Sequence, residues 1–296
     1  MINKKVISWS IALTLLVIGF FIIRTISLNS LPVFVDEAIY IRWSQVMKSE
    51  ASLRFLPMSD GKQPLFMLVT MPFFKVFSDP LIAGRMVSVL SGFGTLVGVM
   101  VLTYLLYTSL FTSFLAGLIY SVIPFTVFFN RMALADSMLA MFGVWVLVFG
   151  YLFSKTLRLD YAMLTGFALG GGLLTKSPAV FFYAWILISI LFFTNIKALK
   201  KNLPQIGQLI LGLLAIFLIS QIMNSILKLG PNSNMAGLRN QDYLYSFKEV
   251  LSHPFSPLIP NLKTSLNWLW LLLTPAVFLS IFMIGKDKTD KKNLIF

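Results

Sequence analysis

The stretch Pro-Val-Phe-Val-Asp-Glu-Ala-Ile-Tyr, residues 32–40, follows shortly after an apolar run over residues 6–26. Two adjacent carboxylates, Asp36 and Glu37, therefore stand just outside a segment that is long enough to cross a bilayer. Charges at the edge of a membrane span are costly unless they meet water, a cation or a reacting group. The pair predicts an active site at a membrane surface, with capping of the following helix as the simpler alternative.

The composition around this stretch is that of a polytopic membrane protein. The chain has 296 residues, of which 57% are hydrophobic and 12% are charged, and its mean hydropathy is +0.84. We attribute the net charge of +13 to the positive-inside rule and to contacts with anionic membrane lipids. Nucleic acid is not expected as a partner, because no basic stretch is interleaved with exposed aromatic residues. The absence of cysteine and the single His253 exclude thiol chemistry and a His-rich metal site.

The apolar runs predict an all-α polytopic fold with about eight transmembrane helices, since a spanning helix needs about 20 apolar residues. The N-terminal run lacks a small-residue cleavage site and is expected to be an uncleaved first span. Basic residues in the short connections predict that both termini are cytoplasmic. The protein is expected in the plasma (inner) membrane. The candidate spans cover residues 6–26, 81–107, 110–129, 137–153, 161–175, 178–194, 206–226 and 265–284.

Two long loops, residues 27–80 and 227–264, are then expected on the outer face. In the first loop, residues 37–47 have helical character, and the apolar run 65–77 is too short to span. Both are expected to form interfacial helices that hold the acidic pair against the bilayer. The second loop predicts either a partly ordered lid or a mobile connector.

The whole chain, residues 1–296, is expected to form a single transmembrane domain without an internal repeat or a separate soluble domain. The sequence ends soon after the eighth candidate span. Two explanations stay open: the chain is truncated, or it is a short member of its family.

Further charged residues gather on the predicted outer face. Cations there suit a phosphate-bearing lipid substrate, and a carboxylate can take a proton from an acceptor hydroxyl. Each residue also has a structural alternative: a solvated turn, a snorkelling side chain, a helix cap or a membrane-boundary lysine. Arg85, inside the second span, is expected to pair with a headgroup or a loop carboxylate in a structural role. The candidates that join the acidic pair are Lys62, Arg131, Asp136 and Lys176.

Four short motifs carry a resemblance to a known family. They are Lys-Gln-Pro-Leu (62–65), Ala-Gly-Arg (83–85), Arg-Met-Ala-Leu-Ala-Asp-Ser (131–137) and Gly-Gly-Gly-Leu-Leu-Thr-Lys (170–176). With the acidic pair before them, their order and spacing resemble the membrane-embedded GT-C glycosyltransferases over roughly residues 6–200. The resemblance is to the family 39-like branch, which contains protein O-mannosyltransferases and the aminoarabinose transferase of lipid A.

The resemblance implies a polyprenyl-phosphate sugar donor, a lipid, glycan or protein acceptor, and an inverting transfer on the outer face of the membrane, as part of cell-envelope chemistry. It implies that Asp36 is the catalytic base and that Lys62 and Lys176 contact phosphate. Glu37 matches the acidic neighbour of the base, and Asp136 matches the acid of the second outer loop. Arg131 is expected to help hold the phosphate.

The chain departs from the family pattern at Ile39, where many relatives carry arginine, and in its short C-terminal part. No nucleotide-sugar site is visible, because the sequence has no Gly-rich strand–helix turn. No cofactor is certain. A divalent metal ion is left open, and Asp36, Glu37 and Asp136 are the carboxylates that could bind it.

Two other functions are weighed against a transferase. A transporter or lipid flippase would share the number of spans, but a carboxylate at the membrane midplane and an inverted repeat, which would favour it, are not found in the sequence. A non-catalytic membrane protein would retain lipid-phosphate binding without turnover.

Overall fold

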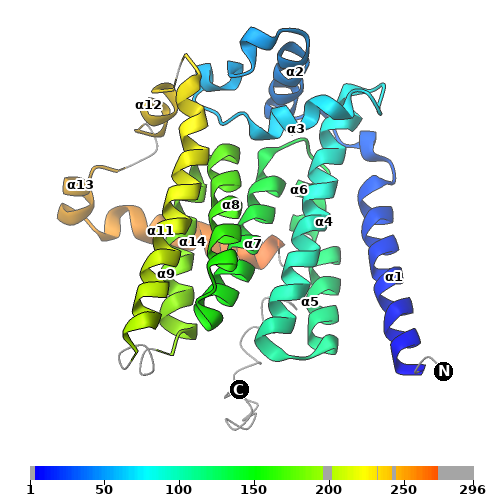
Figure 1. Ribbon diagram of the computed structural model, residues 1–296. Coiled ribbons are helices and arrows are strands. Elements are labelled where there is room, and N and C mark those ends of the chain that lie inside the picture. Colours follow the sequence, from blue (N-terminus) through cyan, green and yellow to red (C-terminus); the bar gives the residue numbers. More distant parts are fainter. Residues whose placement is uncertain (1–3, 196–201, 232, 242–244, 273–296) are drawn as a thin grey trace.

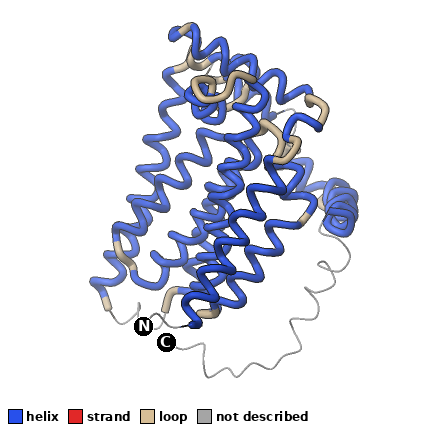
Figure 2. The backbone as a smooth tube through the Cα atoms, turned by 90° about the vertical axis from the view of Figure 1, so that its right-hand side faces the viewer, coloured by secondary structure: helices blue, strands red, loops and turns tan. Residues whose placement is uncertain are grey.

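The computed structural model describes residues 4–195, 202–231, 233–241 and 245–272, and within these ranges the regular structure is entirely helical. Long helices run side by side, and shorter helices cover one end of the bundle (Figures 1 and 2). The predicted all-α class is thus confirmed for the described residues. Some of the basic residues in the short connections, on which the predicted orientation depends, lie outside the described ranges: Lys197, Lys200, Lys201, Lys286, Lys288, Lys291 and Lys292.

The bundle is formed by helices that alternate in direction along the chain (Figure 1). Helix α7 packs against α4, α8 and α9, α11 packs against α8, and α1 and α5 complete the side formed by α4. The bundle helices are α1 (Lys4–Thr25), α4 (Pro80–Tyr107), α5 (Leu110–Val122), α6 (Pro124–Asn130), α7 (Ala135–Thr156), α8 (Leu159–Thr175), α9 (Phe182–Phe193) and α11 (Leu203–Ser225).

Four segments are long and apolar enough to cross a membrane: Val6–Ser30, Pro80–Tyr107, Ala135–Thr156 and Leu203–Leu229. A fifth is added if α5 and α6, which meet at a bend of 63°, form one span. The predicted number of eight is not confirmed. Helix α8 has 17 residues, the apolar segment Ser177–Phe193 is shorter than a span, and most of the eighth candidate lies outside the described residues.

The first long loop folds over one end of the bundle, hereafter the capped end (Figure 1). Its apolar residues form the two helices that the sequence predicts, α2 (Val35–Ser49) and α3 (Leu65–Phe73), joined by short 3-10 turns. Tyr40, Met47 and Phe66 of these helices are buried against residues 132–135 and α4. The loop is therefore a packed layer with its own apolar core.

Local sequence signals explain where the bundle helices begin and break. Asp79 accepts a hydrogen bond from the Leu81 backbone N–H (2.8 Å) and Pro80 follows it, so α4 begins with a capped first turn. Pro124 cannot donate a backbone hydrogen bond, and α5 ends just before it at the bend into α6. Backbone carbonyls at the end of α5, inside the bundle, are therefore left without helical hydrogen-bond partners.

The second long loop begins after α11 and contains α12 (Met235–Gln241), α13 (Phe247–Ser252) and α14 (Phe255–Leu272). Helix α12 packs on the 3-10 turn Leu56–Asp60 of the first loop. Thus the two long loops meet at the capped end.

Candidate functional site

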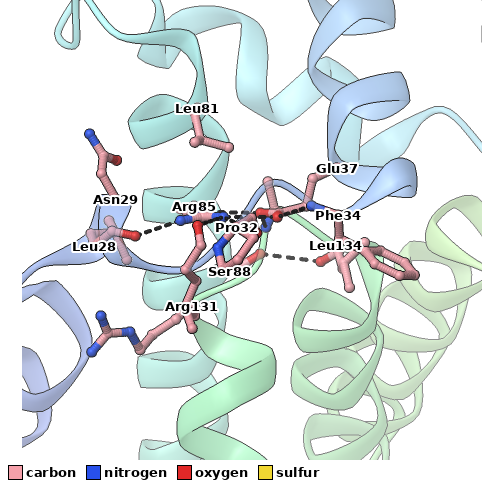
Figure 3. A network of polar contacts seen from close by, with 12 residues as sticks. Leu28, Asn29, Pro32, Phe34, Glu37, Leu81, Arg85, Ser88, Arg131 and Leu134 are labelled. Carbon is pink, nitrogen blue, oxygen red and sulfur yellow. Dashed lines mark hydrogen bonds and ion pairs between the residues drawn. The ribbon is translucent and has the colours of Figure 1, made fainter.

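A buried ion pair holds the first loop in place. Glu37 and Arg85 are both 0% exposed, and Glu37 accepts two hydrogen bonds of 2.9 Å from the Arg85 guanidinium. Glu37 also accepts from the backbone N–H groups of Ala133 (2.6 Å) and Phe34 (3.1 Å). Arg85 in turn donates to backbone carbonyls of residues 28, 31 and 32 (Figure 3). One carboxylate therefore connects α2, α4 and the segment before α7.

Glu37, which the sequence places among the substrate-binding candidates, is enclosed by protein atoms. Its carboxylate has no exposed surface, and its two oxygens receive four hydrogen bonds from within the protein. The structural role that the sequence suggests for Arg85 is the one seen in its contacts with Glu37.

Arg131 lies at the end of α1, away from the other predicted site residues. Its guanidinium donates to the backbone carbonyls of Ile23 (2.9 Å), Ile26 (2.9 Å) and Ser27 (2.8 Å). It points toward α1 and away from Glu37 (Figure 3). A cation at a helix C-terminus satisfies the last carbonyls and complements the helix dipole, so these contacts give Arg131 a capping role.

The expected base, Asp36, lies beside Lys62 in the first loop. Its Oδ1 is 3.1 Å from Lys62 Nζ, and the two side chains are 41% and 29% exposed. Lys62 Nζ is also 3.8 Å from Asp60 and lies 5.1 Å from the centre of the Tyr40 ring. Arg239 of α12 donates to Asp60 (3.1 Å), which connects the second loop to this group.

A second acid–lysine pair is formed by residues from two bundle helices. Lys176, which follows α8, lies 2.8 Å from Asp136 in the first turn of α7, and both side chains are more than one-third exposed. No side-chain cap is formed at the start of α7. The carboxylate of Asp136 is thus held by a lysine and not by the backbone of its own helix.

One hydrogen bond joins these two pairs. Gln63 Nε2 donates to Ser177 Oγ (2.7 Å), and these residues directly follow Lys62 and Lys176. Tyr40 lies near both pairs: burial raises the pKa of its hydroxyl, and the charges of Asp36, Asp136 and Asp60 add to this effect. Tyr40 therefore stays neutral at ordinary pH. The structure brings together Asp36, Lys62, Asp136 and Lys176, but not Glu37 and Arg131.

A cavity of about 320 Å³ opens beside the second pair, between α6, α7 and α9. Its walls are mostly apolar and aromatic, and Asp136 contributes a carboxylate. An apolar groove next to a charged pair suits a ligand with a hydrocarbon tail and a charged headgroup. The lining residues are Tyr120, Phe125, Thr126, Phe129, Asn130, Asp136, Ser137, Leu139, Ala140, Phe182 and Trp185.

The three carboxylates named as possible metal ligands do not fit a divalent ion. Within the described ranges, no three Asp, Glu, His or Cys side chains converge on one point. Asp36 and Asp136 are each paired with a lysine, and Glu37 is enclosed by Arg85 and two amides. Within the described residues, the proposed site therefore consists of acid–lysine pairs and not of metal ligands.

The site also contains residues that no sequence pattern selects. Gln63, Ser177 and Tyr40 have no charge, and no short motif gives them a role. Their only signal is position, because two of them directly follow the candidate lysines and Tyr40 lies one helical turn after Asp36.

The Glu37–Arg85 contact predicts a loss of stability in acid. Burial alone would raise the pKa of Glu37, but hydrogen bonds from Arg85, Ala133 and Phe34 and the charge of Arg85 outweigh it and lower the pKa. A depressed carboxyl pKa stabilises the fold above the unfolded value, and this contribution is lost as the pH falls toward the folded value. We expect the midpoint temperature of unfolding of the wild-type protein in detergent to decrease when the pH is lowered below about 4.5. An E37Q variant should be less stable at every pH and should lack this acid-dependent decrease. Equal acid sensitivity of the two proteins would contradict the role given to the Glu37–Arg85 contact.

Comparison with known proteins identifies the family of the chain. A family model described as dolichyl-phosphate-mannose-protein mannosyltransferase matches residues 61–221, which is more than half of the chain. The match includes Lys62, Asp136 and Lys176, whereas Asp36 and Glu37 precede it. No curated protein and no solved structure matches the chain. The chain therefore belongs to the dolichyl-phosphate-mannose-protein mannosyltransferase family, and it is a multi-pass membrane glycosyltransferase of the GT-C type.

Proposed function

We propose that this protein transfers a sugar from a polyprenyl-phosphate donor to an acceptor hydroxyl at the capped end of the bundle, with inversion at the anomeric carbon. The observation that carries the proposal is the hydrogen bond between Gln63 and Ser177. It holds two acid–lysine pairs, contributed by different segments of the chain, beside a mostly apolar cavity. This arrangement offers a base, cations for a phosphate and a place for a hydrocarbon chain.

In the proposed reaction, Asp36 takes the proton from the acceptor hydroxyl as its oxygen attacks the anomeric carbon. The bond between the anomeric carbon and the phosphate oxygen breaks, and its electron pair leaves with polyprenyl phosphate. Lys176 and Lys62 stabilise the charge that develops on the leaving phosphate. A direct displacement with one base and one leaving group inverts the anomeric centre.

The resting pairs suggest how the base becomes available. Lys62 neutralises Asp36 in the structure, and Lys176 neutralises Asp136. Lysine is a flexible point charge, and a donor phosphate can compete with the carboxylates for it. We therefore propose that donor binding draws the lysines toward the phosphate and leaves Asp36 free to accept a proton.

Glu37 and Arg131 receive positioning roles in this proposal. Glu37 fixes the start of α2 and thereby the place of Asp36, its neighbour in the chain. Arg131 fixes the end of α1 through three backbone carbonyls. Neither needs to touch substrate to be necessary for the geometry of the site.

We further propose that the capped end faces the outer side of the plasma membrane, with α2 and α3 at the interface. The helices alternate in direction, and two basic residues, Lys155 in the last turn of α7 and Arg158 just before α8, lie at the opposite end of the bundle. The positive-inside rule favours that end as cytoplasmic. Eight spans remain our proposal for the whole chain.

The test is a transfer assay with purified protein in liposomes and a set of radiolabelled polyprenyl-phosphate sugars. Release of polyprenyl phosphate together with a labelled lipid, glycan or protein acceptor would establish the activity and name the sugar. Donor binding without turnover for every donor and acceptor class would favour the non-catalytic alternative, and movement of intact donor across the bilayer would favour a flippase.

In this assay, K176M is expected to raise the KM for the donor by about tenfold or more, because one charge-assisted contact to phosphate is lost. The matched control is K155M, the same substitution near the opposite end of α7, where Lys155 lies over the rings of Tyr151 and Phe193. An equal rise of KM in both variants would show that Lys176 has no specific contact with the donor.

A further inference from the structure

A buried arginine without an acidic partner lies behind the cavity. Arg24, in the last turn of α1, is 0% exposed. Its Nε donates to Asn130 Oδ1 (3.0 Å), and its Nη atoms donate to the carbonyls of Ser121 (3.0 Å) and Tyr120 (3.4 Å). All these acceptors are neutral, and no carboxylate of the described part of the chain forms an ion pair with Arg24.

The break between α5 and α6 explains the hydrogen bonds of Arg24 but not its charge. The two carbonyls lie at the end of α5, where the helix stops before Pro124 and leaves them without helical partners. A neutral donor could satisfy such groups. A full charge buried inside a membrane protein is expensive, and the backbone carbonyls and the Phe20 ring, whose centre lies 3.8 Å from the guanidinium carbon, offset only part of this cost.

The cavity beside the second acid–lysine pair borders the residues that bind Arg24. Tyr120, Thr126 and Asn130 contact the Arg24 guanidinium, and the same three residues line the cavity. Asn130 lies between the two: its Oδ1 accepts from Arg24, and its Nδ2 donates to Ser137 Oγ (3.0 Å) on the cavity wall. The guanidinium is therefore separated from the cavity by a single layer of side chains.

Arg24 is a buried positive charge beside the cavity that no carboxylate of the described residues balances, whereas Arg131, which also has no carboxylate partner, is more exposed and binds the carbonyls at the end of α1. Asp136 lines the cavity, but Lys176 neutralises it at 2.8 Å. The remaining charge is that of Arg24, and it acts through a medium of low polarity, where electrostatic interactions are weakly screened. A phosphodiester carries one negative charge, and the mostly apolar walls suit a hydrocarbon chain attached to it.

We propose that Arg24 is the buried counter-charge for the phosphate of the lipid-linked donor, and that it makes this cavity select anionic over neutral polyprenyl lipids. The inference rests on the proposed function and names the residue that gives the site its charge selectivity. When the sugar leaves, the phosphodiester becomes a phosphomonoester with more negative charge, which the same guanidinium stabilises. Arg24 acts through Asn130 without touching the reacting atoms, so it is a positioning and specificity residue.

The test changes the charge beside Arg24 without removing Arg24. N130D places a carboxylate where Asn130 Oδ1 already accepts from Arg24, so the positive charge is balanced inside the protein. N130D also loses the hydrogen bond from Asn130 Nδ2 to Ser137. The control S137A loses that bond, together with the bond from Ser137 Oγ to the Phe129 carbonyl, and leaves the charge of Arg24 unbalanced as in the wild-type protein. Replacement of Arg24 itself is less informative, because its bonds to the α5 carbonyls would be lost as well.

The measurement is the dissociation constant of farnesyl phosphate and of farnesol, each titrated by isothermal calorimetry into purified protein, with inorganic phosphate as a third probe. We expect the wild-type protein and S137A to prefer farnesyl phosphate to farnesol, and N130D to lose about tenfold of this preference. The affinity for farnesol should change little. Weak binding of inorganic phosphate would assign the site to a lipid headgroup and not to the free ion.

An unchanged preference in N130D, or no preference in the wild-type protein, would overturn the proposal and leave Arg24 with only its structural bonds. Tighter binding of inorganic phosphate than of farnesyl phosphate would also overturn it. Sugar transfer is measured separately, so the two proposals can fail independently. If N130D weakens the preference for farnesyl phosphate over farnesol but the wild-type protein transfers no sugar, the transferase proposal is refuted. If the wild-type protein transfers sugar but N130D keeps this preference unchanged, only the role of Arg24 is refuted.

Discussion

Replacing Asp36 by Asn is expected to lower the kcat of sugar transfer by about 10²- to 10⁴-fold, the usual contribution of a general base. The amide keeps the size of the side chain but cannot accept the proton of the acceptor hydroxyl. Because Asp36 is exposed and outside the buried Glu37–Arg85 contact, the fold should persist. The measurement is initial transfer rate at saturating donor, together with the unfolding midpoint of the same preparation.

The matched control is D60N. Asp60 is the other carboxylate near Lys62, at 3.8 Å, and it also accepts from Arg239. If loss of any charge beside Lys62 disturbed the donor phosphate, D60N and D36N would impair the enzyme equally and mainly through KM. We expect D60N to retain kcat within about tenfold. A D36N enzyme with a substantial residual kcat would remove Asp36 from the role of base.

The largest effect on stability is expected from E37Q, with a loss of about 3–5 kcal/mol, as is usual when one partner of a buried ion pair is removed. The amide that this substitution introduces would place N–H donors against the donors of Arg85 and Ala133, and the Arg85 charge would stay buried without a partner. The free energy of unfolding in a graded series of sodium dodecyl sulfate in mixed micelles measures this loss.

A double variant separates the ion pair from the remaining contacts. In E37Q/R85Q both charges are absent, so the cost of an unpaired buried cation disappears. We expect the double variant to be more stable than E37Q, with a coupling energy above about 1 kcal/mol in the double-mutant cycle. Additive losses in the cycle, or an E37Q protein as stable as the wild type, would show that Glu37 is not the residue that fixes the first loop.

The sequence was most informative about the helices and the charged candidates at the capped end. Long apolar runs predicted α1, α4, α7 and α11 closely, because such a run has few alternatives to a spanning helix in a membrane protein. The short apolar runs were harder to interpret, since length alone does not separate a span from a buried helix. The bend at Pro124 is an example: composition alone predicted one span over residues 110–129, whereas the structure has two helices, α5 and α6, that meet at a bend.

The roles of the charged residues could not be separated by sequence. Asp36 and Glu37 are neighbours of the same charge, yet one is exposed beside Lys62 and the other is enclosed by Arg85 and backbone amides. Successive residues on a helix point about 100° apart, so adjacency in the chain does not mean a shared environment. The role of Arg131 likewise depends on where α1 ends in space, which no local sequence pattern predicts.

The contacts of Glu37 also have a consequence for biosynthesis. Its carboxylate binds the backbone N–H of Ala133, which is synthesised 96 residues later, and Gln63 binds Ser177, 114 residues later. The nascent chain therefore cannot fix Asp36 when α2 leaves the ribosome, and the two acid–lysine pairs cannot meet before α8 has been inserted. The proposed reaction centre is therefore completed late in membrane insertion, and an interrupted or misinserted chain would carry Asp36 without the geometry that the proposed reaction requires.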